Sequence, residues 1–177
     1  MKHTILVMPY RSPCGGLLLG SLDDRLCLCD WQVEKHRGSV DRRLQRILHA
    51  EFREETSPVL EKAAAQLDEY FAGVRRGFDV PLLFAGTEFQ QTVWRELLRI
   101  PFGTTVSYGE MARRIGMSRA VRAVANANGA NALSIFAPCH RVIGSDRSLT
   151  GYGGGLETKR MLLELESRAA ASFIQKG

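Results

Sequence analysis

Long apolar runs are missing from this chain of 177 residues, and none approaches the roughly 20 residues that cross a bilayer. The first eight residues are too short and too quickly polar for a signal peptide. Aromatic residues are few, at 8 %, but hydrophobic residues reach 45 %, which excludes wholesale disorder or a fibrous repeat. We therefore expect one large or two small domains, no membrane association, and a cytoplasmic protein, or a nuclear one in a eukaryote.

Cysteine is also scarce. The sequence holds only Cys14, Cys27, Cys29 and Cys139. Because they are unevenly spaced and no export signal precedes them, we expect free thiols rather than a disulfide framework. Together with the histidines they match no standard metal-site spacing, so we expect no metal.

Acidic residues are outnumbered by basic residues, 19 to 24, which gives a formal net charge of +5. The excess lies between residues 85 and 160, which hold ten Lys or Arg and five Asp or Glu, whereas the remaining residues are balanced. A neutral part joined to a basic part indicates that the second part meets a polyanion. An excess of this size is also common on ordinary solvated surfaces.

The first 84 residues predict a small sheet with helices. A hairpin is expected over residues 16–31, with its turn at residues 22–24. Strand alternation would place Cys27 and Cys29 on one apolar face, and Leu26 and Leu28 on the other, as in a strand covered on both sides.

Two helices are expected to follow the hairpin. Apolar residues at 44, 47 and 48 have helical spacing, and Ser57-Pro58 is a typical helix start that leads to a stop at Gly73. The extended segment 78–84 contains Pro81, which favours an edge strand or a linker. We place the domain boundary there, giving domains 1–84 and 85–177.

The second part predicts helices separated by glycine and proline. Thr87 is expected to cap the first, and Ser107 with Glu110 to form a capping box that opens the second. Ser118 is expected to cap a third, from Arg119 to about residue 128. Two short helices joined by a tight glycine turn predict a helix-turn-helix. On spacing alone, DNA binding and a plain helical hairpin are about equally favoured, while alanines along the third helix favour close approach to a partner.

An apolar run over residues 132–144 carries Cys139 beside His140 and Arg141. Neighbouring cationic or imidazole groups lower the pKa of a thiol and make it a nucleophile. Successive side chains in an extended segment point apart, however, so these residues alone favour an inert buried cysteine.

The motif Pro138-Cys139-His140-Arg141-Val142 resembles the active-site region of the 6-O-alkylguanine-DNA alkyltransferases, also called methylated-DNA–protein-cysteine methyltransferases. The segments 151–156 and 159–166, with their glycine run and Lys-x-x-Leu-Leu-x-x-Glu pattern, strengthen the resemblance, which is strong over residues 86–166. It implies an α/β (α+β) fold, with a small ribonuclease-H-like sheet domain followed by a mostly helical winged-helix-like DNA-binding domain. It also implies DNA repair without a cofactor: irreversible, single-turnover transfer of the alkyl group from 6-O-alkylguanine, with 4-O-alkylthymine as a second lesion.

The resemblance assigns four catalytic residues. Cys139 would accept the alkyl group, His140 would activate the thiol through a bridging water, and Glu166 would orient the histidine. Asn131 would brace the active-site turn. The position of Glu166 on the apolar side of its helix independently indicates a buried partner.

The resemblance further implies a monomer that binds double-stranded DNA through the minor groove and turns the damaged nucleotide out of the stack. Tyr108 would crowd the adjacent phosphate and line the base pocket, and Arg122 would fill the vacated space. The remaining pocket residues would be Ser134, Val142, Tyr152, Gly153 and Gly154. The remaining DNA contacts would be Arg119, Ala123 and Arg141.

Three positions depart from the family pattern, since Ala132, Ser134 and Ala137 replace larger or stiffer residues and predict a roomier pocket. Three other functions are alternatives. A non-enzymatic alkyltransferase-like protein would replace the cysteine, a helix-turn-helix regulator would not need the Cys139 motif, and a cysteine hydrolase would need a separate His and Asn or Asp.

Overall fold

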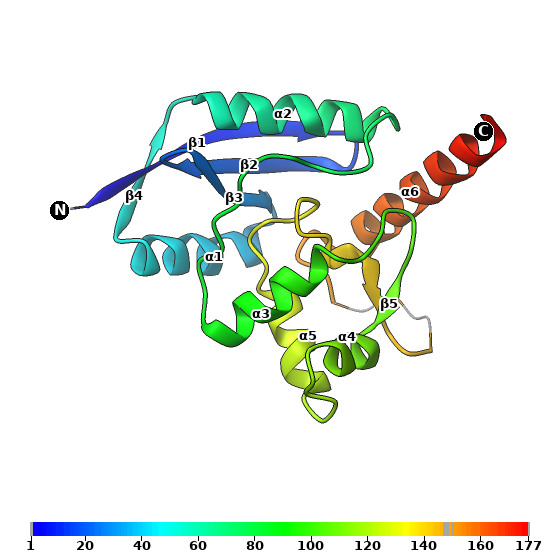
Figure 1. The fold of residues 1–177 in the computed structure, drawn as a ribbon. Coiled ribbons are helices and arrows are strands. Elements are labelled where there is room, and N and C mark those ends of the chain that lie inside the picture. The colour runs from blue at the N-terminus through cyan, green and yellow to red at the C-terminus, as the bar shows by residue number, and fades with distance from the viewer. Residues whose placement is uncertain (1, 147–148, 150, 177) are drawn as a thin grey trace.

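The structure is a computed structural model that describes residues 2–146, 149 and 151–176. A sheet with two helices is followed by a second, mostly helical part (Figure 1). The predicted α/β class, with a small sheet domain before a helical domain, is confirmed. Within the described ranges, no helix is long and apolar enough to cross a membrane.

The N-terminal sheet has four strands in the order β3-β2-β1-β4. They are β1 (His3–Ser12), β2 (Gly15–Leu22), β3 (Arg25–Trp31) and β4 (Ala50–Glu54), and only the β1–β4 pair is parallel. The hairpin expected over residues 16–31 is the β2–β3 pair, whereas β1 and β4 were not predicted. Helix α2 (Pro58–Phe71) covers one face and α1 (Glu34–Ile47) the other (Figure 1).

A β-bulge in β3 overturns the predicted alternation. The β2–β3 register shifts between Gly20 and Ser21, and Cys27 has no partner in that register. Because a bulge adds one residue to one strand, the residues on either side change faces. Cys29 therefore packs in the core beneath α2, whereas Cys27 packs with Leu28 beneath α1. The two cysteines lie on opposite faces, and both faces are apolar.

Local signals placed α2 and the linker correctly. The Ser57 hydroxyl accepts a hydrogen bond from the Leu60 N–H at 3.2 Å, Pro58 is the first helical residue, and Gly73 has φ +79° just beyond the end. The linker then pairs with the free edge of β3, since the Leu26 N–H donates to the Pro81 carbonyl. This edge position suits a proline, which lacks an N–H.

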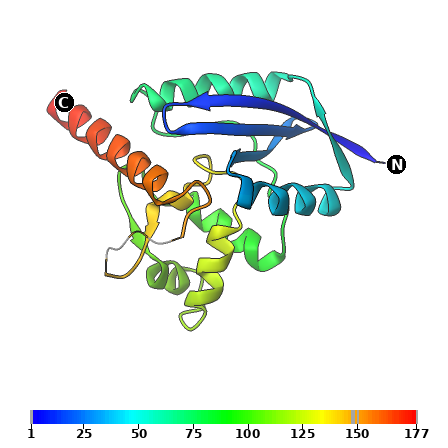
Figure 2. The same cartoon turned by 180° about the vertical axis from the view of Figure 1, so that it is seen from behind.

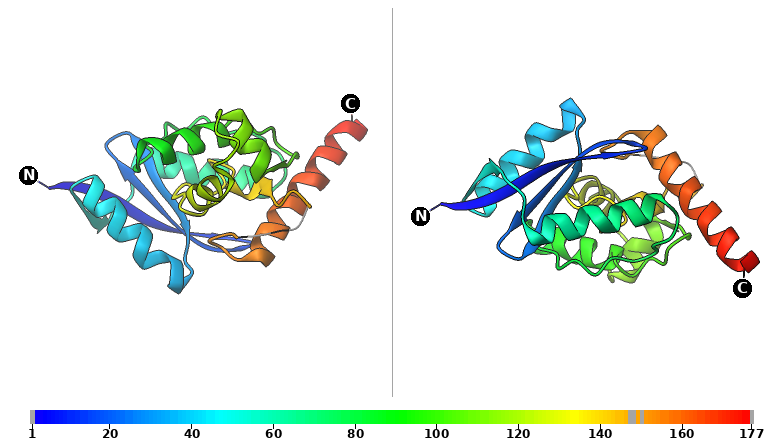
Figure 3. Two further views of the ribbon diagram at one scale, coloured as in Figure 1. Left: turned by 90° about the horizontal axis from the view of Figure 1, so that it is seen from below. Right: turned by 90° about the horizontal axis from the view of Figure 1, so that it is seen from above.

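The second part holds α3 (Glu88–Leu97), α4 (Tyr108–Arg114), α5 (Val121–Gly129) and α6 (Leu156–Lys176). A 3₁₀ turn, η1 (Cys139–Arg141), and the strand β6 (Val142–Ile143) follow α5, and β6 pairs in parallel with β5 (Val106–Ser107), which precedes α4. Thr87 and Gln90 form the capping box of α3. Figures 2 and 3 show α6 running away from the rest of the molecule.

One predicted capping box and one predicted helix start need correction. The Ser107 hydroxyl caps α4, but the Glu110 carboxylate pairs with Arg113 and Arg114. Helix α5 begins at Val121, and its N-cap residue is Ala120, without a side-chain cap. Ser118 therefore does not cap it, because the connecting turn extends two residues further than the serine signal indicated. The helix-turn-helix itself is present as α4 and α5.

The two parts share one core. Side chains of β2, β3 and α2 form a single buried cluster with those of α3, α5 and the segment that holds Cys139. Within it, the Trp94 indole N–H donates to the Ala127 carbonyl at 2.8 Å and ties α3 to α5. The segment after α5 is thus enclosed between the sheet and the helices, which positions the site described next.

Candidate active site

The segment that precedes Cys139 is pinned to the sheet edge. The Cys29 N–H donates to the Ala132 carbonyl at 2.8 Å, and the Ser134 N–H donates to the Cys29 carbonyl at 2.8 Å. Ile135 follows with φ +73°, a strained conformation for a β-branched residue that costs about 1–3 kcal/mol. The strained turn directs the chain into η1, whose first residue is Cys139.

Asn131, two residues beyond the end of α5, holds the Cys139 turn through side-chain hydrogen bonds. Its amide nitrogen donates to the Ala137 carbonyl at 2.9 Å and to the Cys139 sulfur at 3.2 Å, and its oxygen accepts from the Leu133 N–H at 3.0 Å. A single buried side chain thus fixes both the backbone and the thiol.

The Cys139 thiol is buried, with 3 % of the residue exposed. Burial raises its pKa to about 11, while the Asn131 hydrogen bond and the charge of Lys159 act in the opposite direction. Lys159, on α6, is itself fully buried, and its ammonium donates to the Val142 carbonyl at 2.6 Å. Burial lowers the pKa of Lys159 to about 8, while the charge of Cys139 raises it.

Lys159 had no predicted role. The spacing could have indicated its burial, because Lys159, Leu162 and Glu166 fall on one face of a helix at i, i+3 and i+7. A lysine on the face that carries Leu162 must be buried with a partner.

His140 and Glu166 meet in the interior, 2.6 Å apart between Nε2 and Oε2. Burial favours a raised pKa for Glu166, but the hydrogen bonds and charges of His140 and Arg141 outweigh it and hold the pKa well below its ordinary value. Glu166 is therefore a carboxylate, and the His140 Nε2–H donates to it. That tautomer leaves Nδ1 as an acceptor, and Nδ1 makes no hydrogen bond to any described residue. Burial lowers the pKa of His140, so the ring is neutral at neutral pH.

The Glu166 carboxylate accepts hydrogen bonds from three further groups, none of which the sequence predicted as its partner. The Tyr70 hydroxyl of α2 donates to it at 2.7 Å, the Gly103 N–H at 3.2 Å and the Arg141 Nε at 2.8 Å. Tyr70 comes from the other domain, so no local pattern could have linked it to Glu166.

Arg141 needs correction as a predicted DNA contact. Its side chain is buried, and its guanidinium binds Glu166 and the Ile100 carbonyl. It lies in the interior because the carboxylate that orients His140 requires a cationic partner.

The predicted pocket residues come from several elements of the chain. Tyr108 opens α4, and the Lys159 ammonium lies 5.8 Å from its ring centroid. Tyr152 accepts a hydrogen bond from the Trp31 indole, and the charge of Cys139 acts on its hydroxyl. Ser134 and Val142 are buried, and Gly153 and Gly154 are half-buried. The structure therefore gathers Tyr108, Tyr152 and Lys159 near Cys139.

The predicted DNA contacts, apart from Arg141, lie on the helix-turn-helix surface. Arg122 and Ala123 are exposed on the first turn of α5, and Arg119 is exposed in the turn before it. Val124 and Ala127 of the same helix face the core. One side of α5 is thus left exposed.

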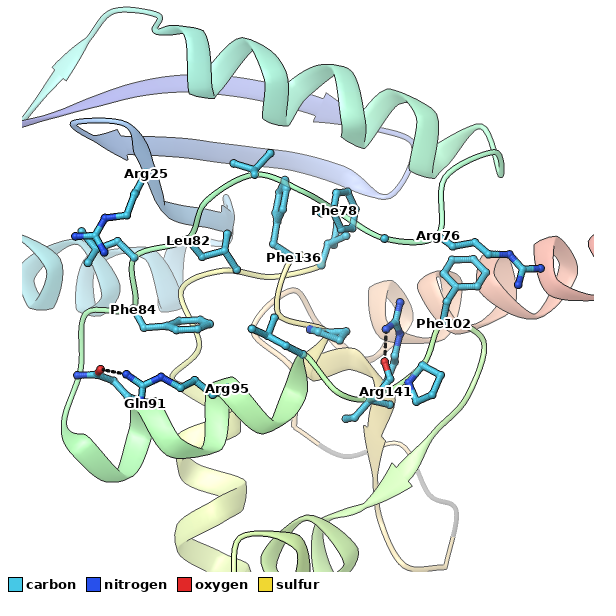
Figure 4. Close-up of a pocket in the computed structure, with 18 residues that line it drawn as sticks. Arg25, Arg76, Phe78, Leu82, Phe84, Gln91, Arg95, Phe102, Phe136 and Arg141 are labelled. Carbon is cyan, nitrogen blue, oxygen red and sulfur yellow. Dashed lines mark hydrogen bonds between the residues drawn. The ribbon is translucent and has the colours of Figure 1, made fainter.

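A cavity of about 800 Å³ lies beside the linker and does not include Cys139 in its lining (Figure 4). Aromatic side chains and arginines from both domains line it, among them Phe78, Phe84, Phe102, Arg25 and Arg95. Pro138, the residue before Cys139, also lines the cavity. Among the residues that the structure describes, no cluster of three or more His, Cys, Asp or Glu could hold a metal.

Family comparisons agree with this geometry. Residues 5–84 match the model for the 6-O-methylguanine DNA methyltransferase ribonuclease-like domain, and residues 88–168 match the model for the DNA-binding domain of the same family. The chain belongs to the 6-O-methylguanine DNA methyltransferase family.

Two curated relatives carry the name methylated-DNA–protein-cysteine methyltransferase. The Haemophilus influenzae protein is 41 % identical over 169 residues, which is 95 % of this chain and 88 % of that protein. The Mycobacterium bovis protein is 59 % identical over 112 residues, 63 % of this chain and 68 % of that protein. The crystal structure of Mycobacterium tuberculosis OGT in complex with DNA has a TM-score of 0.78 at 42 % identity and covers 94 % of both chains.

Proposed function

We propose that this protein repairs DNA by direct reversal, moving the methyl or larger alkyl group of 6-O-alkylguanine onto Cys139. The observation that carries the proposal is the buried array in which Asn131 holds the Cys139 sulfur while the adjacent His140 is oriented by an ionised Glu166. The family match and the names of its relatives agree with this chemistry.

The reaction is a displacement at the alkyl carbon. The Cys139 thiol proton passes to the Nδ1 acceptor of His140, through a bridging water as the family resemblance implies, because Nε2 is held by Glu166. The sulfur then forms a bond to the alkyl carbon as the bond from that carbon to the guanine oxygen breaks. The Gly153 N–H, near the oxygen by the same resemblance, stabilises the leaving guanine. A thioether has no ready leaving group, so each molecule reacts once and needs no cofactor.

The helix-turn-helix provides the DNA contact. Because a stacked base cannot reach a buried thiol, the nucleotide must leave the duplex. The exposed first turn of α5 suits insertion into the minor groove, with Arg122 in the vacated space and Arg119 and Ala123 beside it. Tyr108 opens α4 with the Lys159 ammonium 5.8 Å from its ring centroid, which supports its role in lining the base pocket.

We further propose a domain boundary at residue 84, action as a monomer, and a cytoplasmic or, in a eukaryote, nuclear location. The protein would also act on 4-O-alkylthymine and accept larger alkyl groups than methyl. Ala132, Ser134 and Ala137 are buried, so their small size bears on the space around Cys139. Rates on 6-O-methyl-, ethyl- and butylguanine duplexes test the last point, and a strict preference for methyl would contradict it.

A stoichiometric titration tests the function itself. A duplex that carries one 6-O-methylguanine with a radiolabelled methyl group is incubated with increasing protein, and label bound to protein is counted. We expect one methyl group per protein molecule and no further turnover. Binding of the duplex without label on the protein would instead identify a non-enzymatic lesion-binding protein, the alternative that the presence of Cys139 disfavours.

A further inference from the structure

The last residue of β3, Trp31, reaches out of the sheet domain to the glycine-rich segment before α6. Its indole N–H donates to the Tyr152 hydroxyl at 2.9 Å, and the two rings meet edge to face with centroids 6.3 Å apart. Only 2 % of Trp31 is exposed. A buried tryptophan normally directs its N–H to a partner, and here the partner is a pocket residue of the other domain.

A second contact joins the same two segments. A Cβ added to Gly154 would lie 2.7 Å from both Cγ and Cδ1 of Trp31, closer than real side chains approach. The backbone at Gly154 therefore rests on the indole ring, and glycine is required there by packing.

The glycine-rich segment needs such support. Gly151 and Gly155 adopt φ of +45° and +93°, and glycine backbones lose much conformational freedom when they become ordered. Trp31, by contrast, is fixed by the sheet, since it pairs with Leu17. Figure 3 shows the start of α6 beside the end of the sheet.

The same strand also holds the segment that leads to the nucleophile. Two residues before Trp31, the Cys29 backbone pins Ala132 and Ser134, which precede the Cys139 turn. One edge strand of the N-terminal domain therefore fixes both the segment that delivers Cys139 and the glycine-rich segment.

We propose that Trp31 is a positioning residue for alkyl transfer, which holds Tyr152 and Gly154 in the geometry that closes the base pocket over Cys139. The inference rests on the proposed function and gives the N-terminal domain a part in the reaction rate. Because the Tyr152 oxygen accepts from the indole, its own hydrogen is directed away from Trp31. Burial and the charge of Cys139 raise the pKa of Tyr152 well above its ordinary value, so the phenol stays a neutral donor.

The test compares Trp31→Phe with wild type in three measurements: affinity for an unmodified duplex, first-order methyl-transfer rate at saturating 6-O-methylguanine duplex, and thermal midpoint. We expect the DNA affinity of Trp31→Phe to stay within about twofold of the wild-type value. Its transfer rate should be lower by about five- to tenfold, because the variant loses one hydrogen bond and holds the glycine-rich segment less firmly. Trp94→Phe is the matched control, because it loses an equal side-chain volume and one indole hydrogen bond, to Ala127, away from the pocket. Its transfer rate at saturation should stay near that of wild type.

A double-mutant cycle separates positioning from general destabilisation. In a Tyr152→Phe background, Trp31→Phe should change the transfer rate by less than about twofold, because its partner is already gone. Gly154→Ala supplies a variant with Trp31 intact, and it should slow transfer with little change in DNA affinity.

Three results would overturn the inference: a wild-type transfer rate in Trp31→Phe and Gly154→Ala, an undiminished effect of Trp31→Phe in the Tyr152→Phe background, or an equal loss in Trp94→Phe. A wild-type protein that transfers no methyl group would instead overturn the proposed function, so the two failures are distinguishable.

Discussion

Replacing Glu166 by glutamine tests the buried array with a change of one atom. In the wild type the carboxylate accepts hydrogen bonds from Tyr70, Gly103, His140 and Arg141 at 2.6–3.2 Å. Oε1 faces two of these donor groups and Oε2 faces three. An amide nitrogen in either place would meet donors, so Glu166→Gln cannot satisfy the site in either orientation.

The expected loss of stability is large. Breaking a buried ion pair by neutralising one partner costs about 3–5 kcal/mol, which is a large share of the roughly 5–15 kcal/mol that stabilises a typical domain. For a chain of this size the thermal midpoint should fall by on the order of 10 °C. The transfer rate should fall by about 10²–10⁴-fold at a temperature where the variant is folded, because His140 loses the carboxylate that sets its tautomer.

Glu164→Gln is the matched control on the same helix. The Glu164 side chain is 48 % exposed and pairs only loosely with Arg160 and Arg168, at 3.5 and 3.6 Å. Its replacement should change stability by less than about 0.5 kcal/mol and leave methyl transfer unchanged. Calorimetry and label transfer give both readouts. If Glu166→Gln behaved like Glu164→Gln in both, the carboxylate would neither hold the array nor orient His140.

Three further changes probe other parts of the site. Asn131→Ala should raise the pKa of the Cys139 thiol and slow its reaction with iodoacetamide, because the substitution removes a hydrogen bond that lowers this pKa. Asn126→Ala, at an exposed position, should leave the reaction rate of the thiol unchanged. Equal reaction rates in the two variants would contradict the bracing role of Asn131. The transfer rate should fall as pH rises above about 8, because Lys159 there loses the charge that stabilises the Cys139 thiolate. Lys159→Met should abolish this fall. A transfer rate of the wild type that keeps rising to pH 9 would contradict this role of Lys159. Arg122→Ala should slow transfer from duplex DNA but not from single strands, whereas an equal loss on both would exclude the wedge role.

Local sequence signals correctly predicted where two helices begin and end. Thr87, Ser57 and the glycine stops placed α3 and α2, because caps satisfy backbone groups within a few residues of the chain. The motif around Cys139 predicted a contact of Glu166 with His140, and these side chains lie 2.6 Å apart, while Asn131 bonds the Cys139 sulfur at 3.2 Å.

The remaining features depend on distant parts of the chain. Whether Cys27 and Cys29 share a face is decided by a bulge in the pairing of β3 with β2, which no property of β3 alone reveals. The burial of Arg141 follows from Glu166, 25 residues away, and the bond of Tyr152 to Trp31 spans 121 residues. The prediction that Ser118 caps α5 was wrong, because the sequence does not distinguish a serine in a connecting turn from a serine at a helix start.

Intact mass spectrometry after incubation with a 6-O-methylguanine duplex tests alkyl transfer to Cys139 without any label. We expect that the protein gains one methyl group, that peptide mapping places it on Cys139, and that Cys139→Ser gains none while Cys27→Ser gains one. A folded wild-type protein that gains no mass, or a methyl group found on Cys14, Cys27 or Cys29, would contradict it.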